Sequence, residues 1–201
     1  PLTWGLNPNL SNRIPMVFDY VYKNKSDLDY FVTGDSGAGY VNPSALVLNR
    51  RRYRTLPDAT ATWVEYNAPY LGRFNMDICG FILNGAMNYC TEVYDMYSKI
   101  TPVGAFSNSS EKLTLYNGTP ILSMTDYQTP EQSFYYMKNK INFSVFRTIR
   151  ISPSDVKDIA MQIEEYCNNR DTRFTYKYVG PYELFDLIKQ SGLGRVVDPL
   201  G

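Results

Sequence analysis

The chain has 201 residues, of which 44% are hydrophobic and 20% charged, and its twenty basic residues balance its twenty acidic ones. This composition excludes disordered and collagen-like chains and predicts a single domain, residues 1–201, with a full hydrophobic core. No apolar run is long enough to span a membrane, and the short basic cluster Arg50–Arg54 is interpreted as a solvated segment. Neither a membrane span nor a nucleic-acid partner is therefore expected.

Histidine is absent from the sequence, and this excludes several catalytic classes. A serine nucleophile of the triad type needs an imidazole to take its proton, so triad catalysis cannot occur within this chain. The three cysteines, Cys79, Cys90 and Cys167, form no C-x-x-C pair, and a zinc site is unsupported. We expect buried thiols, with Cys79 in a strand and Cys167 on a helix face. No metal or cofactor is expected, although a Ca²⁺ or Mg²⁺ site made of carboxylates alone is an open alternative.

Hydrophobic periodicity and turn residues predict alternating helices and strands along the chain. In the first half we expect helices over 12–23, 57–74 and 91–100, and strands over 28–33, 76–83 and 103–106. In the second half we expect strands over 120–124, 143–151 and 174–179, and helices beginning near 130, 153 and 181. The last of these helices ends near Gly192, and an irregular tail follows it.

This order of elements predicts an α/β fold with mostly parallel strands joined by right-handed crossovers. We expect a (β/α) barrel-like domain, incomplete or distorted relative to a TIM-type barrel, with an open doubly wound sheet as the alternative. The chain begins at Pro1 rather than Met, and we interpret it as an excised segment of a longer protein. In either fold the functional residues gather at the carboxyl ends of the strands.

The loop over residues 34–43 (GDSGAGYVNP) follows the first predicted strand and carries the densest group of polar and glycine residues. It is not a nucleophile elbow, because the residue two after Ser36 is Ala38. It is not a dinucleotide fingerprint, because Asn42 stands where the third glycine belongs, and it lacks the lysine of a phosphate-binding loop. The loop therefore predicts a polar, conformationally permissive corner at the end of a strand.

Residues 37–43 (GAGYVNP) resemble the motif of the GxGYxYP putative glycoside hydrolases, which are common in gut bacteria that degrade polysaccharides. The segment containing Trp4, Asn7 and Pro8 is similar to the W-x-x-N-P segment of that family. Residues 146–149 (FRTI) and 152–154 (SPS) are similar to its late strand and helix start. Asn42 departs from the final tyrosine of the motif. The resemblance implies that the chain is the C-terminal domain of a longer protein, and it also implies an Asp- and Asn-rich strand end ahead of Trp4, before this chain begins.

The resemblance implies hydrolysis of a glycosidic bond in a poly- or oligosaccharide, which requires two carboxyl groups and no histidine. Position in the predicted fold selects the catalytic candidates: Asp35 ranks first, because it follows a predicted strand and lies in the glycine loop, and Asp126, which also follows a predicted strand, ranks second. The alternatives are that Asp35 accepts backbone hydrogen bonds that hold its turn, and that Asp126 caps its corner. The implied substrate-binding residues are Ser36, Tyr40, Asn84, Tyr127 and Arg147.

The roles of two of these binding residues have structural alternatives. Arg147 lies in an otherwise apolar strand and would reach either a ligand or a structural carboxylate partner. Tyr40 would stack on a sugar or wedge its own loop. The aromatic content of 15% suits sugar binding and ordinary cores alike.

A second functional class is a non-catalytic carbohydrate-binding or cell-surface module that uses the same cleft. A metal-dependent deacetylase is disfavoured, because its metal would normally need histidine ligands. The expected partners are a carbohydrate and another domain of the same polypeptide. The expected location is secreted, periplasmic or at the surface of a bacterium.

Overall fold

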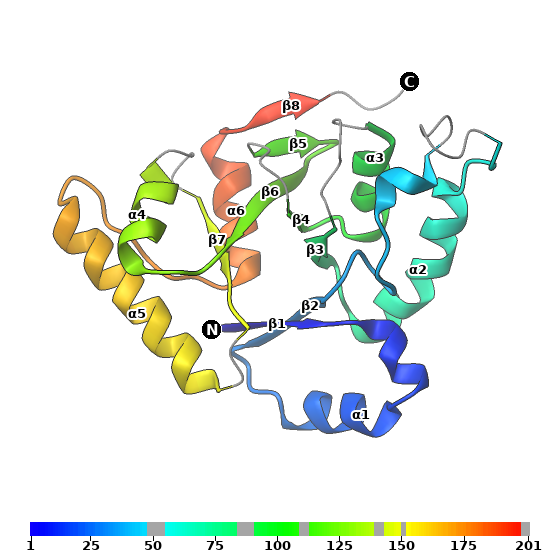
Figure 1. Cartoon of the computed structure of the whole chain (residues 1–201), viewed down its shortest axis with the longest axis horizontal. Helices are drawn as coiled ribbons and strands as arrows, with labels where there is room; N and C mark the ends of the chain where they lie inside the picture. Colours follow the sequence, from blue (N-terminus) through cyan, green and yellow to red (C-terminus); the bar gives the residue numbers. More distant parts are fainter. Residues whose placement is uncertain (48–54, 84–90, 109–112, 139–142, 150–151, 198–201) are drawn as a thin grey trace.

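The computed structural model describes residues 1–47, 55–83, 91–108, 113–138, 143–149 and 152–197. These residues form an α/β fold on a mixed, mostly parallel sheet to which they contribute eight strands (Figure 1). The strands are β1 (Leu2–Leu6), β2 (Asp29–Thr33), β3 (Ile78–Ile82), β4 (Gly104–Ser107), β5 (Thr114–Tyr116), β6 (Thr119–Asp126), β7 (Val145–Arg147) and β8 (Arg195–Val197). Their order in the sheet is β1-β2-β3-β4-β6-β5-β8, and β7 pairs with the end of β6. Over the described residues the sheet does not close, so the fold is an open sheet or an incomplete barrel.

The helices are α1 (Pro15–Asn24), α2 (Thr60–Phe74), α3 (Thr91–Ile100), α4 (Pro130–Lys138), α5 (Pro153–Arg170) and α6 (Pro181–Ser191), with short 3-10 helices η1 (Pro8–Asn12) and η2 (Pro43–Leu46). Helices α1, α2 and α3 each connect two neighbouring parallel strands, in the order β1, β2, β3 and β4. Right-handed crossovers of this kind place all three helices on the same face of the sheet. None of the helices in the described ranges is long and apolar enough to cross a membrane.

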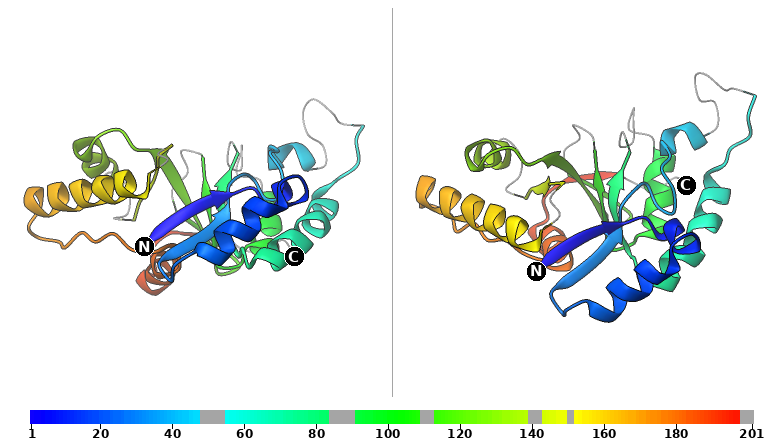
Figure 2. Two further views of the ribbon diagram at one scale, coloured as in Figure 1. Left: turned by 90° about the horizontal axis from the view of Figure 1, so that it is seen from below. Right: turned by 60° about the horizontal axis from the view of Figure 1, so that its bottom comes forward.

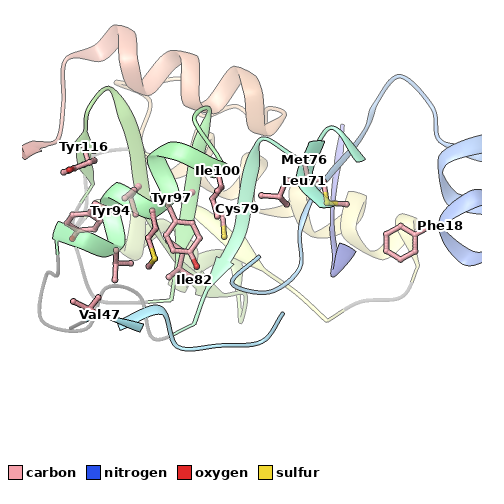
Figure 3. Packing of buried hydrophobic residues seen from close by; sticks show 14 residues of the cluster. Phe18, Val47, Leu71, Met76, Cys79, Ile82, Tyr94, Tyr97, Ile100 and Tyr116 are labelled. Carbon is pink, nitrogen blue, oxygen red and sulfur yellow. The ribbon is translucent and has the colours of Figure 1, made fainter. Parts of the chain in front are cut away.

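Two hydrophobic clusters hold the helices to the sheet. The cluster beneath α1, α2 and α3 includes Phe18, Leu71 and Tyr97, and Figure 3 shows Tyr97 beside Cys79 of β3. The second cluster lies on the other face, where Phe185 of α6 stacks on Phe106 of β4 with ring centroids 4.9 Å apart. Because both faces of the central strands are covered, β3 and β4 read as nearly continuous apolar runs.

Helices α4 and α5 lie together at one end of the molecule, away from α1 and α2 (Figures 1 and 2). They pack through a small separate cluster made by Phe134 and Met137 of α4 and Cys167 of α5. Cys79 and Cys167 are both buried free thiols in the elements predicted for them, while Cys90 lies outside the described residues. Burial raises the pKa of the Cys79 thiol to about 11.

The structure corrects one predicted strand. Residues 174–179 form an extended segment that pairs with none of the strands in the described part of the chain. Side chains of α5 take the backbone donors that a sheet would otherwise satisfy. Asn168 Oδ1 accepts from the Tyr176 amide at 2.7 Å, and Glu164 Oε2 accepts from the Tyr178 amide at 3.0 Å.

Three short strands, β1, β5 and β8, were not predicted. Strands β5 and β6 form a hairpin whose turn has positive φ at Asn117 (47°) and Gly118 (75°). An Asn-Gly pair between apolar runs is a strong hairpin signal, so the sequence did contain this information. Strand β8 pairs in parallel with β5, and the tail after Gly192 is therefore partly ordered.

Predicted boundaries also shift, and the helix predicted over 12–23 is α1, which begins at Pro15 after the separate 3-10 helix η1. Helix α2 begins at Thr60 rather than Pro57, because the Asp58 side chain accepts a hydrogen bond from the Thr60 amide at 2.9 Å. The strand predicted over 143–151 is shorter, as β7 spans Val145–Arg147 and residues 150–151 are not described.

An acid-sensitive ion cluster fixes the end of α5. The buried carboxylate of Asp171 accepts hydrogen bonds from Arg173 Nε at 2.9 Å and from the Lys138 ammonium of α4. The Arg173 guanidinium and then Lys138 hold the pKa of Asp171 well below its usual range. The stabilisation is therefore complete above the unfolded pKa of about 4 and is lost as pH falls toward the lower folded value.

We expect Asp171→Asn to destabilise the chain at pH 5 to 7, and we expect its difference from the wild type to shrink below pH 4. Urea unfolding at pH 7, 5, 3 and 2 measures this difference. Asp158→Asn, on the exposed surface of the same helix, is the control. A difference that stays constant across this pH range would contradict the ion cluster as its cause.

Candidate functional site at the carboxyl ends of β1 and β2

Asn7 and Asp35 meet where two neighbouring parallel strands end. Leu6 of β1 and Thr33 of β2 are register partners, so the residues that follow them emerge at the same edge of the sheet. Asn7 Nδ2 donates a hydrogen bond to Asp35 Oδ2 at 2.5 Å. Asn7 Oδ1 accepts from the Asn9 amide at 3.1 Å and caps η1. Because Oδ1 of Asn7 accepts the capping hydrogen bond, the Nδ2 end of its side-chain amide faces Asp35.

Buried hydrogen bonds hold the backbone of the loop that carries Asp35 in place. Ser36 is fully buried, its Oγ accepts from the Leu83 amide at 3.1 Å, and its carbonyl accepts from the Tyr97 hydroxyl at 2.6 Å. Asn67 Oδ1 accepts from the Ala38 amide at 2.6 Å. Burial raises the pKa of Tyr97 well above its ordinary value, so this phenol stays protonated and remains a donor. The loop backbone is therefore fixed against β3, α2 and α3.

Two side chains of the loop, Asp35 and Tyr40, are accessible to solvent. Asp35 is half-buried, and its Oδ1 accepts no hydrogen bond from the residues that the structure describes. Tyr40 is 68% exposed. Asn42 caps η2 by accepting from the Ser44 amide at 3.1 Å. An asparagine thus has a local structural role at the position where the family motif has tyrosine.

Asp126 and Arg147 bind each other. The Arg147 guanidinium donates to both carboxylate oxygens of Asp126, from Nε at 2.7 Å and from Nη2 at 3.1 Å. Its guanidinium carbon lies 5.0 Å from the centroid of the Phe81 ring. Arg147, in β7, thus has a carboxylate partner on the adjacent end of β6, and a bidentate pair of this kind is strongly oriented. The neighbouring Tyr127 is half-buried, and its amide donates to the Arg147 carbonyl at 2.8 Å.

The sheet order separates the two predicted carboxylates. Asp35 follows β2, Asp126 ends β6, and β3 and β4 lie between them. Three strand spacings of roughly 4.8 Å correspond to about 14 Å along the sheet. Glycosidases need carboxyl groups about 5 to 9.5 Å apart. Asn84 lies outside the described residues, and among the described residues no three His, Cys, Asp or Glu side chains cluster as metal ligands would.

Sequence reasoning missed three residues that shape the site: Asn7, Asn67 and Tyr97. Asn7 had a readable signal, because an Asn-Pro pair directly follows an extended segment and is typical of a capped helix start. Asn67 and Tyr97 looked like ordinary positions on helix faces. Their contact with the loop depends on how α2 and α3 pack, which no local pattern encodes.

Comparison with known proteins agrees with this architecture. The chain matches the model of the GxGYxYP putative glycoside hydrolase C-terminal domain over residues 1–189. A crystal structure from Bacteroides thetaiotaomicron VPI-5482, described as a "putative hydrolase", shares the fold with a TM-score of 0.69 and 16% sequence identity. The alignment covers 94% of this chain and 39% of that one. The comparison with curated proteins finds no match. With the family model spanning nearly its whole length, the chain belongs to the GxGYxYP putative glycoside hydrolase family, as its C-terminal domain.

Proposed function

We propose that this domain supplies Asp35 to the active site of a glycoside hydrolase that cleaves a poly- or oligosaccharide. The observation that carries the proposal is the geometry of the Asp35 carboxylate. One oxygen is fixed by Asn7, and the other accepts no hydrogen bond from the described residues. An oriented carboxylate with one available oxygen suits a general base that activates water, or a nucleophile that attacks the anomeric carbon.

The second carboxyl group of the mechanism comes, in this proposal, from another part of the polypeptide. Asp126 is unsuited to pair with Asp35, because it lies three strands away and is bound by Arg147. The domain spans 39% of the length of the solved structure that shares its fold, so a longer protein has room for that group. This complementary group would protonate the leaving oxygen as the general acid.

The remaining site residues fall into two groups in the proposal. Tyr40, in the same loop as Asp35, is exposed and offers an aromatic face for a sugar ring. Tyr127 and the Asp126–Arg147 pair line the rim farther along the sheet, where they would contact more distant sugar units. Ser36 is buried, and in this proposal its hydrogen bonds to Leu83 and Tyr97 keep the loop backbone in position for Asp35. Since a polysaccharide cannot enter a cell intact, we place the protein outside the cytoplasm, secreted, periplasmic or at the cell surface.

A carbohydrate-binding module without catalysis is the second candidate. The observation in its favour is that Asp126, the other predicted carboxylate, is already bound through both oxygens by Arg147. Such a module would bind sugars through Tyr40 and the polar groups of the loop, and would release no product.

A glycan panel separates the two functions. We expect the full-length polypeptide to release new reducing ends from at least one plant or host polysaccharide, as measured by a reducing-sugar assay. Retention of a glycan on an affinity gel without release of reducing ends would favour the binding module. No binding and no cleavage across a broad panel would contradict both.

A further inference from the structure

An apolar groove lies beside the Asp35 loop, on the sheet face that also carries α6. Its volume is about 900 Å³, and it is bounded by β1 and β2, by α5 and by the extended segment 174–179. Lining residues include Trp4, Val32, Phe81, Ile159 and Leu187. Val32 and Phe81 belong to the same cluster as Phe185 of α6, so the groove continues the hydrophobic core.

Several apolar side chains that line this groove are more exposed to solvent than the side chains of a hydrophobic core. Val156 and Ile159 of α5 line the groove and are only half-buried. Ile149, Phe174 and Leu187 also line it, and they are 91%, 51% and 41% exposed. An exposed apolar surface of this kind marks a binding site for a protein, a ligand or a membrane.

The free edge of β1 forms one border of the groove. The Leu2 amide donates to Leu28 O at 2.7 Å, and Leu6 O accepts from the Gly34 amide at 2.8 Å, so these residues face β2. Peptide groups alternate in direction along a parallel strand, and those of Thr3 and Gly5 therefore point to the open edge. Both residues are exposed, and no strand of the described chain pairs with this edge. Such an edge is a ready template for strand addition.

Four charged residues that line or border the groove already have partners within the domain, and so does Glu164. Arg147 binds Asp126, and Lys177 Nζ lies 3.2 Å from Glu183 Oε1. Glu164 accepts the Tyr178 amide at 3.0 Å. Along β1, α5 and segment 174–179 the groove thus presents apolar surface and backbone groups, which fit a protein strand. The part of the groove at the ends of β6 and β7 keeps Tyr127 and Arg147 for the sugar.

We propose that another segment of the same polypeptide docks here, adding a β-strand to the edge of β1 and burying apolar side chains in the groove. The chain matches a C-terminal domain and covers 39% of the solved structure that shares its fold. A longer polypeptide would supply this segment at a high effective concentration, because the two parts are covalently joined. Docking completes the sheet at β1 and covers α5, and it is independent of whether the site cleaves sugars.

Hydrogen exchange of the full-length polypeptide tests the strand. Leu2, Trp4 and Leu6 are protected by β2 in any case, so the amides of Thr3 and Gly5 report on the outer edge. We expect both to exchange at least about 100-fold more slowly than unpaired amides, as measured by mass spectrometry with fragmentation of the peptide that spans residues 1–8. Exchange at the rate of unpaired amides would overturn the proposal.

A matched pair of α5 variants in the full-length polypeptide tests the groove. Ile159→Lys puts a charge into the groove, whereas Met161→Lys puts the same charge at a position that is 58% exposed and does not line it. We expect Ile159→Lys to speed exchange at Thr3 and Gly5 by about tenfold or more, and Met161→Lys to leave it unchanged. Equal exchange in both variants would refute the groove as the docking site. Protection that depends on protein concentration, with a dimer in sedimentation, would replace the proposal with pairing between two copies.

Discussion

Asp35→Asn in the full-length polypeptide is expected to lower the turnover of a cleaved glycan by about 10²- to 10⁴-fold, the usual contribution of a general base. The substitution keeps the shape of the side chain, and the amide oxygen of the new residue can still accept from Asn7 Nδ2. What is lost is the second oxygen, which can no longer take a proton or attack carbon. The fold and the shape of the binding surface should both survive.

The measurement compares initial rates and melting temperatures of the wild type, Asp35→Asn and Asp158→Asn. Asp158 is an exposed residue of α5, away from the loop, and its variant should match the wild type in both quantities. Turnover of Asp35→Asn at the level of this control would remove Asp35 from the mechanism. A loss of turnover together with a large fall in melting temperature would mean that Asp35 holds the loop instead.

Much of the fold was predictable, because the elements that pack on both faces carry strong patterns. Residues 76–83 are almost uninterrupted hydrophobics, and the strand that they form, β3, lies at the centre of the sheet. The segment 174–179 shows the limit of this reasoning. Its alternation is typical of a strand, yet Asn168 and Glu164 of α5 occupy its backbone donors. Sequence periodicity records which side chains are apolar, and it does not record where the backbone hydrogen bonds go.

The sequence predicted where in the fold Asp35 lies, but it did not predict which of the candidate side chains bind each other. The rule that function gathers at the carboxyl ends of parallel strands placed Asp35 correctly at the end of β2. The same rule selected Asp126 and Arg147 as separate candidates, and in the structure they form one ion pair. Their contact depends on the pairing of β7 with the end of β6. Local sequence patterns do not predict such long-range pairing.

The two glycines of the G-x-G motif differ in what the loop requires of them. Gly37 has φ of 142°, which residues with side chains rarely adopt, and a Cβ there would lie 2.2 Å from Asn67 Oδ1. Gly39 needs no such conformation, and a Cβ there would come no closer than 3.7 Å to its nearest neighbour, an atom of Trp63. The motif spacing alone makes the two positions look equivalent.

We therefore expect Gly37→Ala to reduce the free energy of unfolding by about 2 to 5 kcal/mol, from backbone strain and the loss of a buried hydrogen bond. Asn67 must move to admit the methyl group, and its movement leaves the Ala38 amide unpaired beneath the loop. Gly39→Ala should change the free energy by less than about 1 kcal/mol, because it meets only ordinary contacts. Urea unfolding of both variants of the 201-residue chain measures the difference. Equal stability would show that Asn67 does not fix the loop, and the fixed orientation that Asp35 needs for catalysis would then rest on Asn7 alone.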